Sequence, residues 1–127
     1  MRKYRTEKNK KKIGETGEDL AVHYLISQSY DILFRNFYSA YGEIDIIALR
    51  DNELVFVEVK TRSSRIDDAL SSVSKEKQRK LKQTAGLFYQ KFPEYEDLLS
   101  RFDLIAVILG KKGQIYSIQH FDNAFSY

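Results

Sequence analysis

The 127-residue sequence contains no cysteine and no tryptophan, and it has only one proline and two histidines. Without cysteine, neither a disulfide framework nor a thiolate metal site can form, so any metal would need oxygen or imidazole ligands. The histidines, His23 and His120, lack the H-E-x-x-H spacing of a zinc hydrolase, and we expect a structural role for each. The sequence also lacks G-x-G-x-x-G, P-loop and nucleophile-elbow motifs, which argues against hydride transfer, nucleotide hydrolysis and serine chemistry.

Long apolar runs are missing as well. No segment approaches the roughly 18 apolar residues of a membrane-spanning helix, and the charged N-terminal residues precede no apolar signal-peptide core. A chain of 127 residues with 43% hydrophobic residues is long enough to bury one core. We therefore expect a cytoplasmic protein whose residues 13–127 form a single domain.

Positive charge is concentrated at the N-terminus. Residues 1–12, "MRKYRTEKNKKK", contain seven basic residues and one acid, which leaves 14 basic and 17 acidic residues in the rest of the chain. Such a segment is typical of a disordered arm that attracts nucleic-acid phosphate, although a solubilising tail has the same composition. A second basic cluster, "KEKQRKLK" at residues 75–82, is typical of a solvated helix face.

The hydrophobic pattern predicts alternating helices and strands. Helical periodicity covers residues 15–28 and 74–92, where Ser74 is a plausible cap and Pro93 ends the second helix. Strand patterns cover residues 31–39, 43–49, 53–60, 101–109 and 114–121, with "GKKG" as the last turn. The order αβββαββ predicts an α/β fold with one mixed sheet flanked by helices.

Acidic residues interrupt the second and third strands at positions that otherwise indicate burial. If the "RDNE" turn at residues 50–53 is symmetric, Asp45 lies opposite Glu58 and Glu43 lies opposite Lys60. Like charges that face each other across a strand pair are destabilising, and a divalent cation between them removes the penalty. The hairpin thus predicts one face that carries Glu43, Asp45, Glu58 and Lys60.

Each of these charges also has a structural interpretation. Glu43 and Lys60 could form a surface ion pair, and Asp45 and Glu58 could lie on a solvated sheet edge. The apolar neighbours of the two acids favour a metal site instead, and carboxylate ligands suit Mg²⁺ or Mn²⁺. Lys60, two residues after Glu58, could then orient a water or stabilise charge on a phosphate.

The spacing Asp45, twelve residues, Glu58-Val59-Lys60 resembles the core of the PD-(D/E)xK nuclease superfamily, which has a restriction-endonuclease-like fold. The fuller set "GETGEDLA", "RNF", "GEIDIIA", "LVFVEVKTR", "RFDLIAV" and "NAF" resembles the bacterial YraN family, which is similar to archaeal Holliday junction resolvases. This resemblance spans nearly all of residues 13–125. It implies a Mg²⁺- or Mn²⁺-dependent endonuclease.

The resemblance assigns roles to individual residues. Asp45 and Glu58 correspond to metal ligands, the backbone carbonyl of Val59 to a further ligand, and Lys60 to the catalytic lysine. Glu18 follows Gly14 by four positions. In the resolvase-like pattern, a glutamate at this distance from a glycine completes the metal site. An acid in the first turn of a helix, favoured by the helix dipole, is the alternative for Glu18.

Two details of the resemblance stay open. Gln78 corresponds to a polar helix residue near the site of some relatives, although a solvent-exposed glutamine is the preferred interpretation. The sequence also departs from the superfamily pattern because Ile44, rather than proline, precedes Asp45.

Two classes of function remain from the sequence. The first is metal-dependent hydrolysis of phosphodiester bonds in nucleic acid, with structured or branched DNA as the expected substrate. The second is a non-catalytic nucleic-acid-binding or adaptor module with a nuclease-like fold. Junction resolvases act as dimers because two symmetric strands must be cut, so the first class makes a homodimer one expected assembly.

Overall fold

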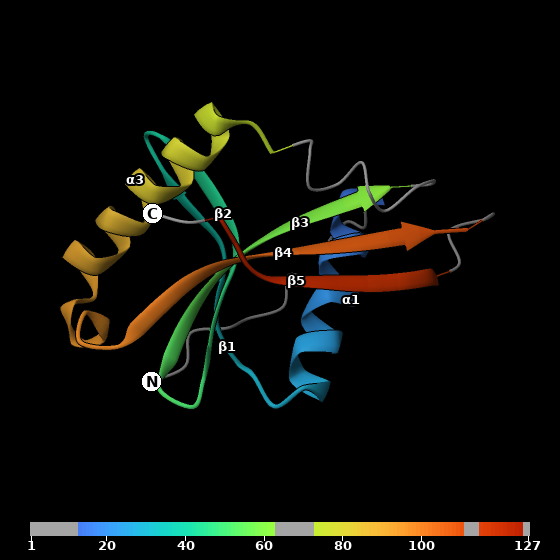
Figure 1. Cartoon of the computed structure of the whole chain (residues 1–127), viewed down its shortest axis with the longest axis horizontal. Helices are drawn as coiled ribbons and strands as arrows, with labels where there is room; N and C mark the ends of the chain where they lie inside the picture. Colours follow the sequence, from blue (N-terminus) through green and yellow to red (C-terminus); the bar gives the residue numbers. More distant parts are fainter. Residues whose placement is uncertain (1–12, 63–72, 111–114, 126–127) are drawn as a thin grey trace.

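The computed structural model describes residues 13–62, 73–110 and 115–125 of the chain. The elements in chain order are α1 Ile13–Ser27, β1 Asp31–Ser39, β2 Gly42–Arg50, β3 Glu53–Arg62, α3 Lys75–Lys91, the short 3-10 helix η1 Pro93–Tyr95, β4 Leu99–Leu109 and β5 Ile115–Phe125 (Figure 1). This order confirms the predicted α/β fold and its helix, three strands, helix, two strands. The predicted arm at 1–12 and most of the predicted "GKKG" turn lie outside the described residues.

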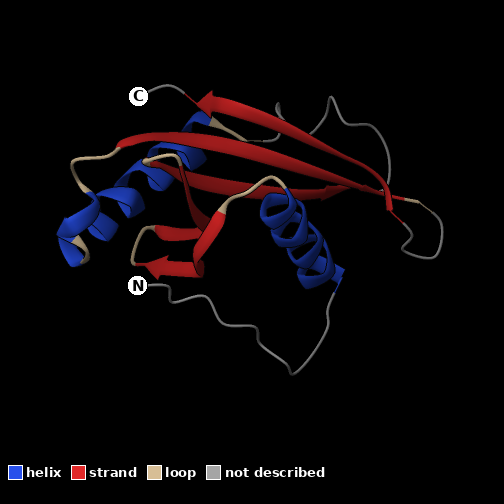
Figure 2. Cartoon of the chain, turned by 90° about the horizontal axis from the view of Figure 1, so that it is seen from below, coloured by secondary structure: helices blue, strands red, loops and turns tan. Residues whose placement is uncertain are grey.

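The five strands form one sheet in the order β1-β2-β3-β4-β5. Neighbouring strands are antiparallel except β3 and β4, which run parallel (Figure 2). A parallel pair needs a long crossover connection, and the segment that contains α3 supplies it. The predicted mixed sheet is therefore confirmed.

The two helices cover opposite faces of this sheet. Leu54 and Phe56 of β3 pack with Phe88 of α3, whereas Val55 and Val57 pack in a separate cluster with residues of α1. In Figure 1 the sheet accordingly separates α3 from α1. Because β3 is covered on both faces, its sequence is an almost continuous apolar run rather than an alternating one. A charged side chain within that run is costly unless it has a function or a partner.

Local signals in the sequence fix the ends of several elements. Ser74 caps α3, since its side chain accepts a hydrogen bond of 3.1 Å from the Lys77 backbone N–H. Asp51 and Asn52 form the two-residue turn between β2 and β3, with φ angles of 53° and 64°. Neither α1 nor α3, the helices of the described residues, is long and apolar enough to cross a membrane.

Candidate metal centre

Strands β2 and β3 part in the middle of the sheet. The register predicted from the turn is confirmed for five pairs, from Arg50–Glu53 to Ile46–Val57, where the ladder between these strands ends. Beyond this point β3 stays paired with β4, and β2 stays paired with β1. We call the point where the strands part, at Asp45 and Glu58, the fork.

The fork corrects the predicted pairing of the charged residues. Asp45 and Glu58 are not a ladder pair, because Oδ2 of Asp45 accepts a 2.7 Å hydrogen bond from the Val59 backbone N–H. The Val59 N–H therefore bonds to a side chain of β2 and not to its backbone. Glu43 pairs with Tyr38 of β1, but it lies beyond the end of the β2–β3 ladder and does not pair with Lys60. The acids still line one cleft, because the parting of the strands opens a space between them.

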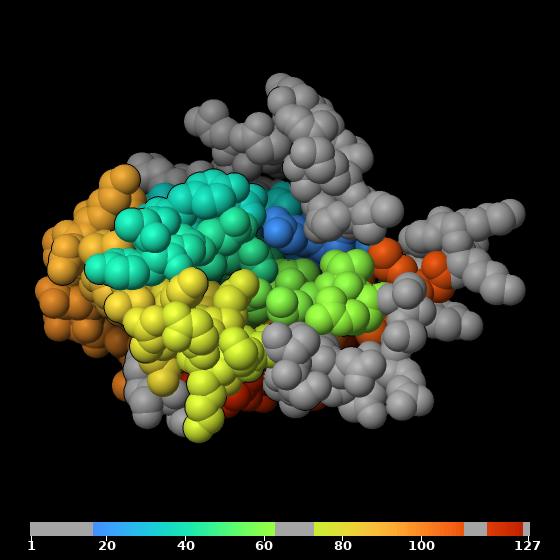
Figure 3. Space-filling model, turned by 90° about the horizontal axis from the view of Figure 1, so that it is seen from above, coloured from blue at the N-terminus to red at the C-terminus, as the bar shows by residue number. Residues whose placement is uncertain are grey.

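This cleft, the fork cleft, has a volume of about 440 Å³. Its lining residues are Glu18, Glu43, Asp45, Glu58, Val59, Lys60, Thr61, Arg62 and Lys77. Every residue predicted for the metal site or for catalysis is among them. Figure 3 shows the face on which the end of β3 (green), the beginning of α3 (yellow) and the β1–β2 hairpin (cyan) lie side by side.

Three acids meet closely in the fork cleft. Glu18, Glu43 and Asp45 each offer a carboxylate oxygen, and these atoms lie within 4.8 Å of one another. The side-chain amide of Asn36 donates to Glu18 Oε1 at 3.1 Å and to Glu43 Oε2 at 2.9 Å. One amide therefore holds two carboxylates at the mouth of the cleft, next to the buried carboxyl of Asp45.

Glu58 is the most buried acid of the cleft, with 5% of its side chain exposed. Its Oε2 lies 3.2 Å from the Lys77 ammonium and 3.6 Å from the Lys60 ammonium. Its Oε1 is buried and has no hydrogen-bond partner among the residues that the structure describes. A buried carboxylate oxygen without a partner is costly, and a bound cation would satisfy it.

Burial and neighbouring carboxylates raise the pKa of two acids in the cleft. Burial, together with the charge of Glu58 and weaker effects of Glu18 and Glu43, raises the pKa of Asp45 to about 9 against the lowering effect of the Val59 N–H. Burial likewise raises the pKa of Glu18, although Asn36 and Arg35 oppose the shift. Without a cation, the fold therefore favours a proton on Asp45 at neutral pH.

Helix α1 reaches the cleft because of a glycine. A Cβ atom at Gly17 would lie 1.9 Å from Oγ1 of Thr61 in β3, so only glycine permits this close approach. The approach places Glu18, the next residue, at the cleft. Arg35 of β1 holds the same turn of the helix, at 3.6 Å from Glu18 and 2.8 Å from Asp19.

Sequence reasoning missed two residues that contact the acids of the cleft, Asn36 and Lys77. Asn36 adopts a positive φ of 54° inside β1, a conformation that asparagine tolerates, and only its place in "RNF" could have drawn attention to it. Lys77 belongs to the cluster interpreted as a solvated helix face, yet it contacts Glu58. The neighbouring Gln78 does not line the fork cleft, because its side chain donates to the Val73 carbonyl at 3.1 Å.

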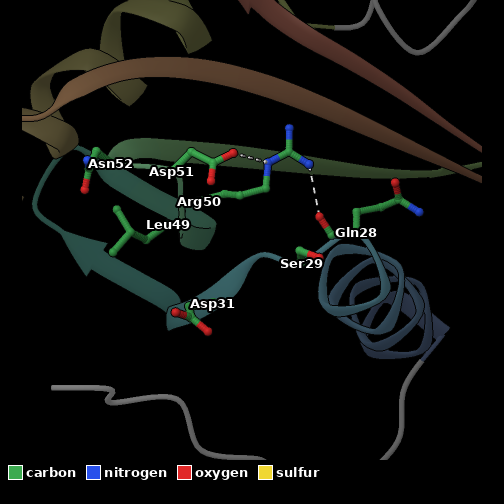
Figure 4. Close-up of a pocket in the computed structure, with 7 residues that line it drawn as sticks. All are labelled: Gln28, Ser29, Asp31, Leu49, Arg50, Asp51 and Asn52. Atoms are coloured by element: carbon green, nitrogen blue, oxygen red, sulfur yellow. Dashed lines mark hydrogen bonds and ion pairs between the residues drawn. The ribbon is translucent and has the colours of Figure 1, made fainter.

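A larger hollow of about 580 Å³ lies at the other end of the β2–β3 hairpin (Figure 4). Arg50 donates to the Gln28 carbonyl there at 3.0 Å and lies 4.2 Å above the Tyr30 ring. The arginine thus joins the end of α1 to the β2–β3 turn. This hollow gathers no set of carboxylates like that of the fork cleft, so its size does not make it the candidate site.

A buried acid outside the fork cleft, Asp103 of β4, is fully partnered. Its carboxylate accepts hydrogen bonds from the Arg101 guanidinium at 2.9 Å and the Asn123 N–H at 2.9 Å, and it lies 2.7 Å from His120 Nε2. His120 Nδ1 in turn lies 3.0 Å from the Tyr24 hydroxyl of α1. This network joins β4, β5 and α1, as expected for a structural histidine.

Comparison with known proteins identifies relatives over most of the chain. Residues 17–107 match the uncharacterised protein family UPF0102, which confirms the resemblance to the YraN family. A UPF0102 protein of Caldicellulosiruptor saccharolyticus is 40% identical over 118 residues, which covers 92% of this chain and 99% of that protein. A UPF0102 protein of Clostridium botulinum is 44% identical over 116 residues, with coverages of 91% and 94%.

Proposed function

The chain belongs to the UPF0102 family, and we propose that it hydrolyses phosphodiester bonds of nucleic acid with a divalent cation bound in the fork cleft. The observation that carries the proposal is a cluster of acids around the buried Asp45 and Glu58 that the neighbouring lysines neutralise only in part. We further propose membership of the restriction-endonuclease-like superfamily and similarity to Holliday junction resolvases. DNA with a branched structure is then the expected substrate, the cytoplasm the expected compartment and a homodimer one expected assembly.

The donor set fits Mg²⁺ or Mn²⁺. All candidate ligands are oxygens, namely the carboxylates of Glu18, Asp45 and Glu58 and the backbone carbonyl of Val59, and hard divalent cations prefer such ligands. Glu43 is an additional ligand candidate because its carboxylate is within 4.8 Å of Glu18 and Asp45. A cation would also favour the charged form of Asp45, against the raised pKa of this carboxyl.

Each residue then has a distinct chemical task. When bound, the cation polarises a phosphate oxygen and activates a water for attack. Lys60, whose ammonium lies 3.6 Å from Glu58, can stabilise the negative charge that develops on the phosphate. Asn36 keeps Glu18 and Glu43 oriented through its two hydrogen bonds.

One observation favours the alternative, a nucleic-acid-binding or adaptor module that does not cleave. Lys60 and Lys77 both contact Glu58 Oε2, so two ammonium groups partly balance the buried acids without any cation. They leave Glu58 Oε1 without a partner and do not hold the pKa of Asp45 down. We therefore rank the nuclease function above the adaptor function.

A cleavage panel tests the proposal. We expect the full chain to cut at least one substrate among linear duplexes, single strands, flaps and four-way junctions in Mg²⁺ or Mn²⁺, and to cut none in EDTA. Asp45→Asn and Glu58→Gln should abolish cleavage, whereas Asp51→Asn, which changes an exposed acid in the β2–β3 turn, should not. Absence of cleavage throughout the panel, from a protein that binds the same nucleic acids, would support the adaptor function.

A further inference from the structure

A second groove continues the fork cleft along α3. This groove has a volume of about 220 Å³, and its lining residues are Tyr41, Gly42, Glu43, Lys77, Lys80 and Leu81. It shares Glu43 and Lys77 with the fork cleft. A polymer that has a phosphate in the fork cleft can therefore place its next unit in this groove. The volume is below the roughly 300–1,000 Å³ of typical small-molecule pockets, which suits one unit of a longer ligand.

Tyr41 forms one wall of the groove and is 45% exposed, so part of its side chain is accessible to a ligand. Its backbone is held in place, since the Tyr41 N–H donates to Ser39 Oγ at 3.0 Å. Ser39 Oγ in turn lies 2.9 Å from the Thr84 hydroxyl of α3. The β1–β2 hairpin is thus tied to α3, so the tyrosine and the lysines of the helix keep a fixed spacing.

Lys77 and Lys80 form the opposite wall, one helical turn apart on α3. Lys80 is exposed, and the acid that interacts with it, Glu76, is itself exposed and paired with Arg79. Lys77 contacts Glu58 at the junction of the two clefts. Two ammonium groups at the spacing of one turn attract the phosphates of a nucleic-acid backbone, and an exposed tyrosine beside them offers a surface for a base.

We propose that this groove binds an unpaired nucleotide, with its base stacked on Tyr41 and the flanking phosphates at Lys77 and Lys80. The inference rests on the proposed function, because it places the neighbouring phosphodiester in the fork cleft. A base inside a duplex is already stacked on its neighbours and cannot offer its face to a side chain. The substrate class is therefore nucleic acid with a single-stranded segment next to the bond that is cut.

The test is a binding experiment without metal, so it does not depend on cleavage. Dye-labelled oligo-dT and a duplex of equal length are titrated with the full chain in EDTA, and fluorescence polarisation is measured. Tyr41→Ala should weaken binding of the single strand on the order of 10- to 100-fold, the usual cost of losing one stacked base, and should leave duplex binding unchanged. Tyr41→Phe keeps the aromatic face and should bind like the wild type.

Two further variants act as controls. Tyr38→Ala removes an exposed tyrosine of the same hairpin that does not line the groove, and it should not change binding. Lys80→Gln should weaken the binding of both the single strand and the duplex and should lower the salt dependence of that binding, because it removes a positive charge that faces the phosphates. Equal losses for single strand and duplex in Tyr41→Ala, unchanged binding of the single strand, or no binding by the wild type would overturn the proposal. If the wild type bound the single strand as predicted but bound no metal or cleaved no substrate, only the proposed function would be contradicted.

Discussion

Two buried aspartates on neighbouring parts of the sheet have opposite surroundings. Asp103 is 0% exposed, and its hydrogen bonds to His120, Arg101 and the Asn123 N–H outweigh burial and lower its pKa. Asp45 is 8% exposed, and burial together with other acids raises its pKa to about 9. The same residue type is therefore charged and compensated in β4, whereas in β2 the fold disfavours its charged form and favours a proton at neutral pH.

The difference indicates which acid stabilises the fold and which serves a ligand. An acid with an arginine, a histidine and a backbone N–H contributes to folding, and the protein loses stability when that acid is removed. An acid surrounded by Glu18, Glu43 and Glu58 costs folding free energy until a cation or a proton arrives. This contrast, rather than the number of acids, distinguishes the fork cleft from a structural network.

The largest effect should come from breaking the compensated network. Asp103→Asn removes the charge partner of His120 and one of the two acids that pair with the half-buried Arg101, the other being Glu53. We expect the free energy of unfolding, measured by urea denaturation, to fall by about 3–5 kcal/mol, the usual cost of removing one member of a buried ion pair. Asp122→Asn changes an exposed acid of β5 and should have little effect. Equal stability of the Asp103 variant and the wild type would contradict a structural role for this network.

Removing Lys60 should affect chemistry rather than stability. Lys60→Ala removes an ammonium group. Because this group cannot bind a metal while it is protonated, metal affinity should be retained. The rate of cleavage should fall roughly 10²–10³-fold, as when one preorganised electrostatic group is removed. Lys91→Ala, at the far end of α3, removes the same charge and should cut normally. Cleavage at the wild-type rate by Lys60→Ala would exclude this lysine from catalysis.

The two aspartates should also give opposite dependences of stability on pH. Since the pKa of Asp45 is raised in the fold, its favourable contribution is complete below the unfolded pKa of about 3.9 and is lost as pH rises towards about 9. The lowered pKa of Asp103 gives stability that is present above about pH 3.9 and is lost as pH falls through the folded value. Urea unfolding of the metal-free protein from pH 6 to 9 should therefore show a decline of at most about 1.4 kcal/mol per pH unit for this single proton.

Asp45→Asn is the control for this decline, because the variant has no carboxyl to titrate at the fork. The difference in stability between this variant and the wild type should grow as pH rises. A constant difference from pH 6 to 9 would show that the fold does not shift the ionisation of Asp45.

The smallest effect concerns residues 1–12, which lie outside the described residues. Their removal deletes seven basic residues and one acid from the chain. Nucleic-acid affinity should fall, and the slope of log affinity against log salt should flatten by about 0.9 for each duplex phosphate that the segment neutralises. Thermal unfolding of residues 13–127 should match that of the full chain. Salt curves that overlay for the two proteins would show that this segment does not contact phosphate.

The fold could be predicted from the sequence because its signals are local. The symmetric turn at Asp51-Asn52 predicted the hairpin register correctly for five pairs, and Ser74 marked the start of α3. The fork could not be predicted, because it depends on a side-chain bond from the Val59 N–H to Asp45 that replaces ladder pairing.

The contacts between distant elements were also beyond the sequence. Lys77 contacts Glu58 only because the crossover places the start of α3 at the cleft. The composition of residues 75–82 is that of any exposed helix. Gly17 matters through its approach to Thr61, a residue of a different element far along the chain. The partners of Asp103 come from several segments, and no spacing in the sequence predicts them.

The central claim is that the acids of the fork cleft, which the lysines compensate only in part, bind a divalent cation. Isothermal titration calorimetry of Mn²⁺ into the metal-free full chain at pH 7.5 tests it most directly, with Asp45→Asn and the exposed-site control Asp51→Asn in parallel. We predict that the wild type and Asp51→Asn bind, and that Asp45→Asn does not bind although it unfolds in EDTA at the same or a higher urea concentration. Binding should release about one proton, seen as heats that differ between buffers of different ionisation enthalpy. Absence of Mn²⁺ binding by the wild type, or wild-type affinity in Asp45→Asn, would contradict the account.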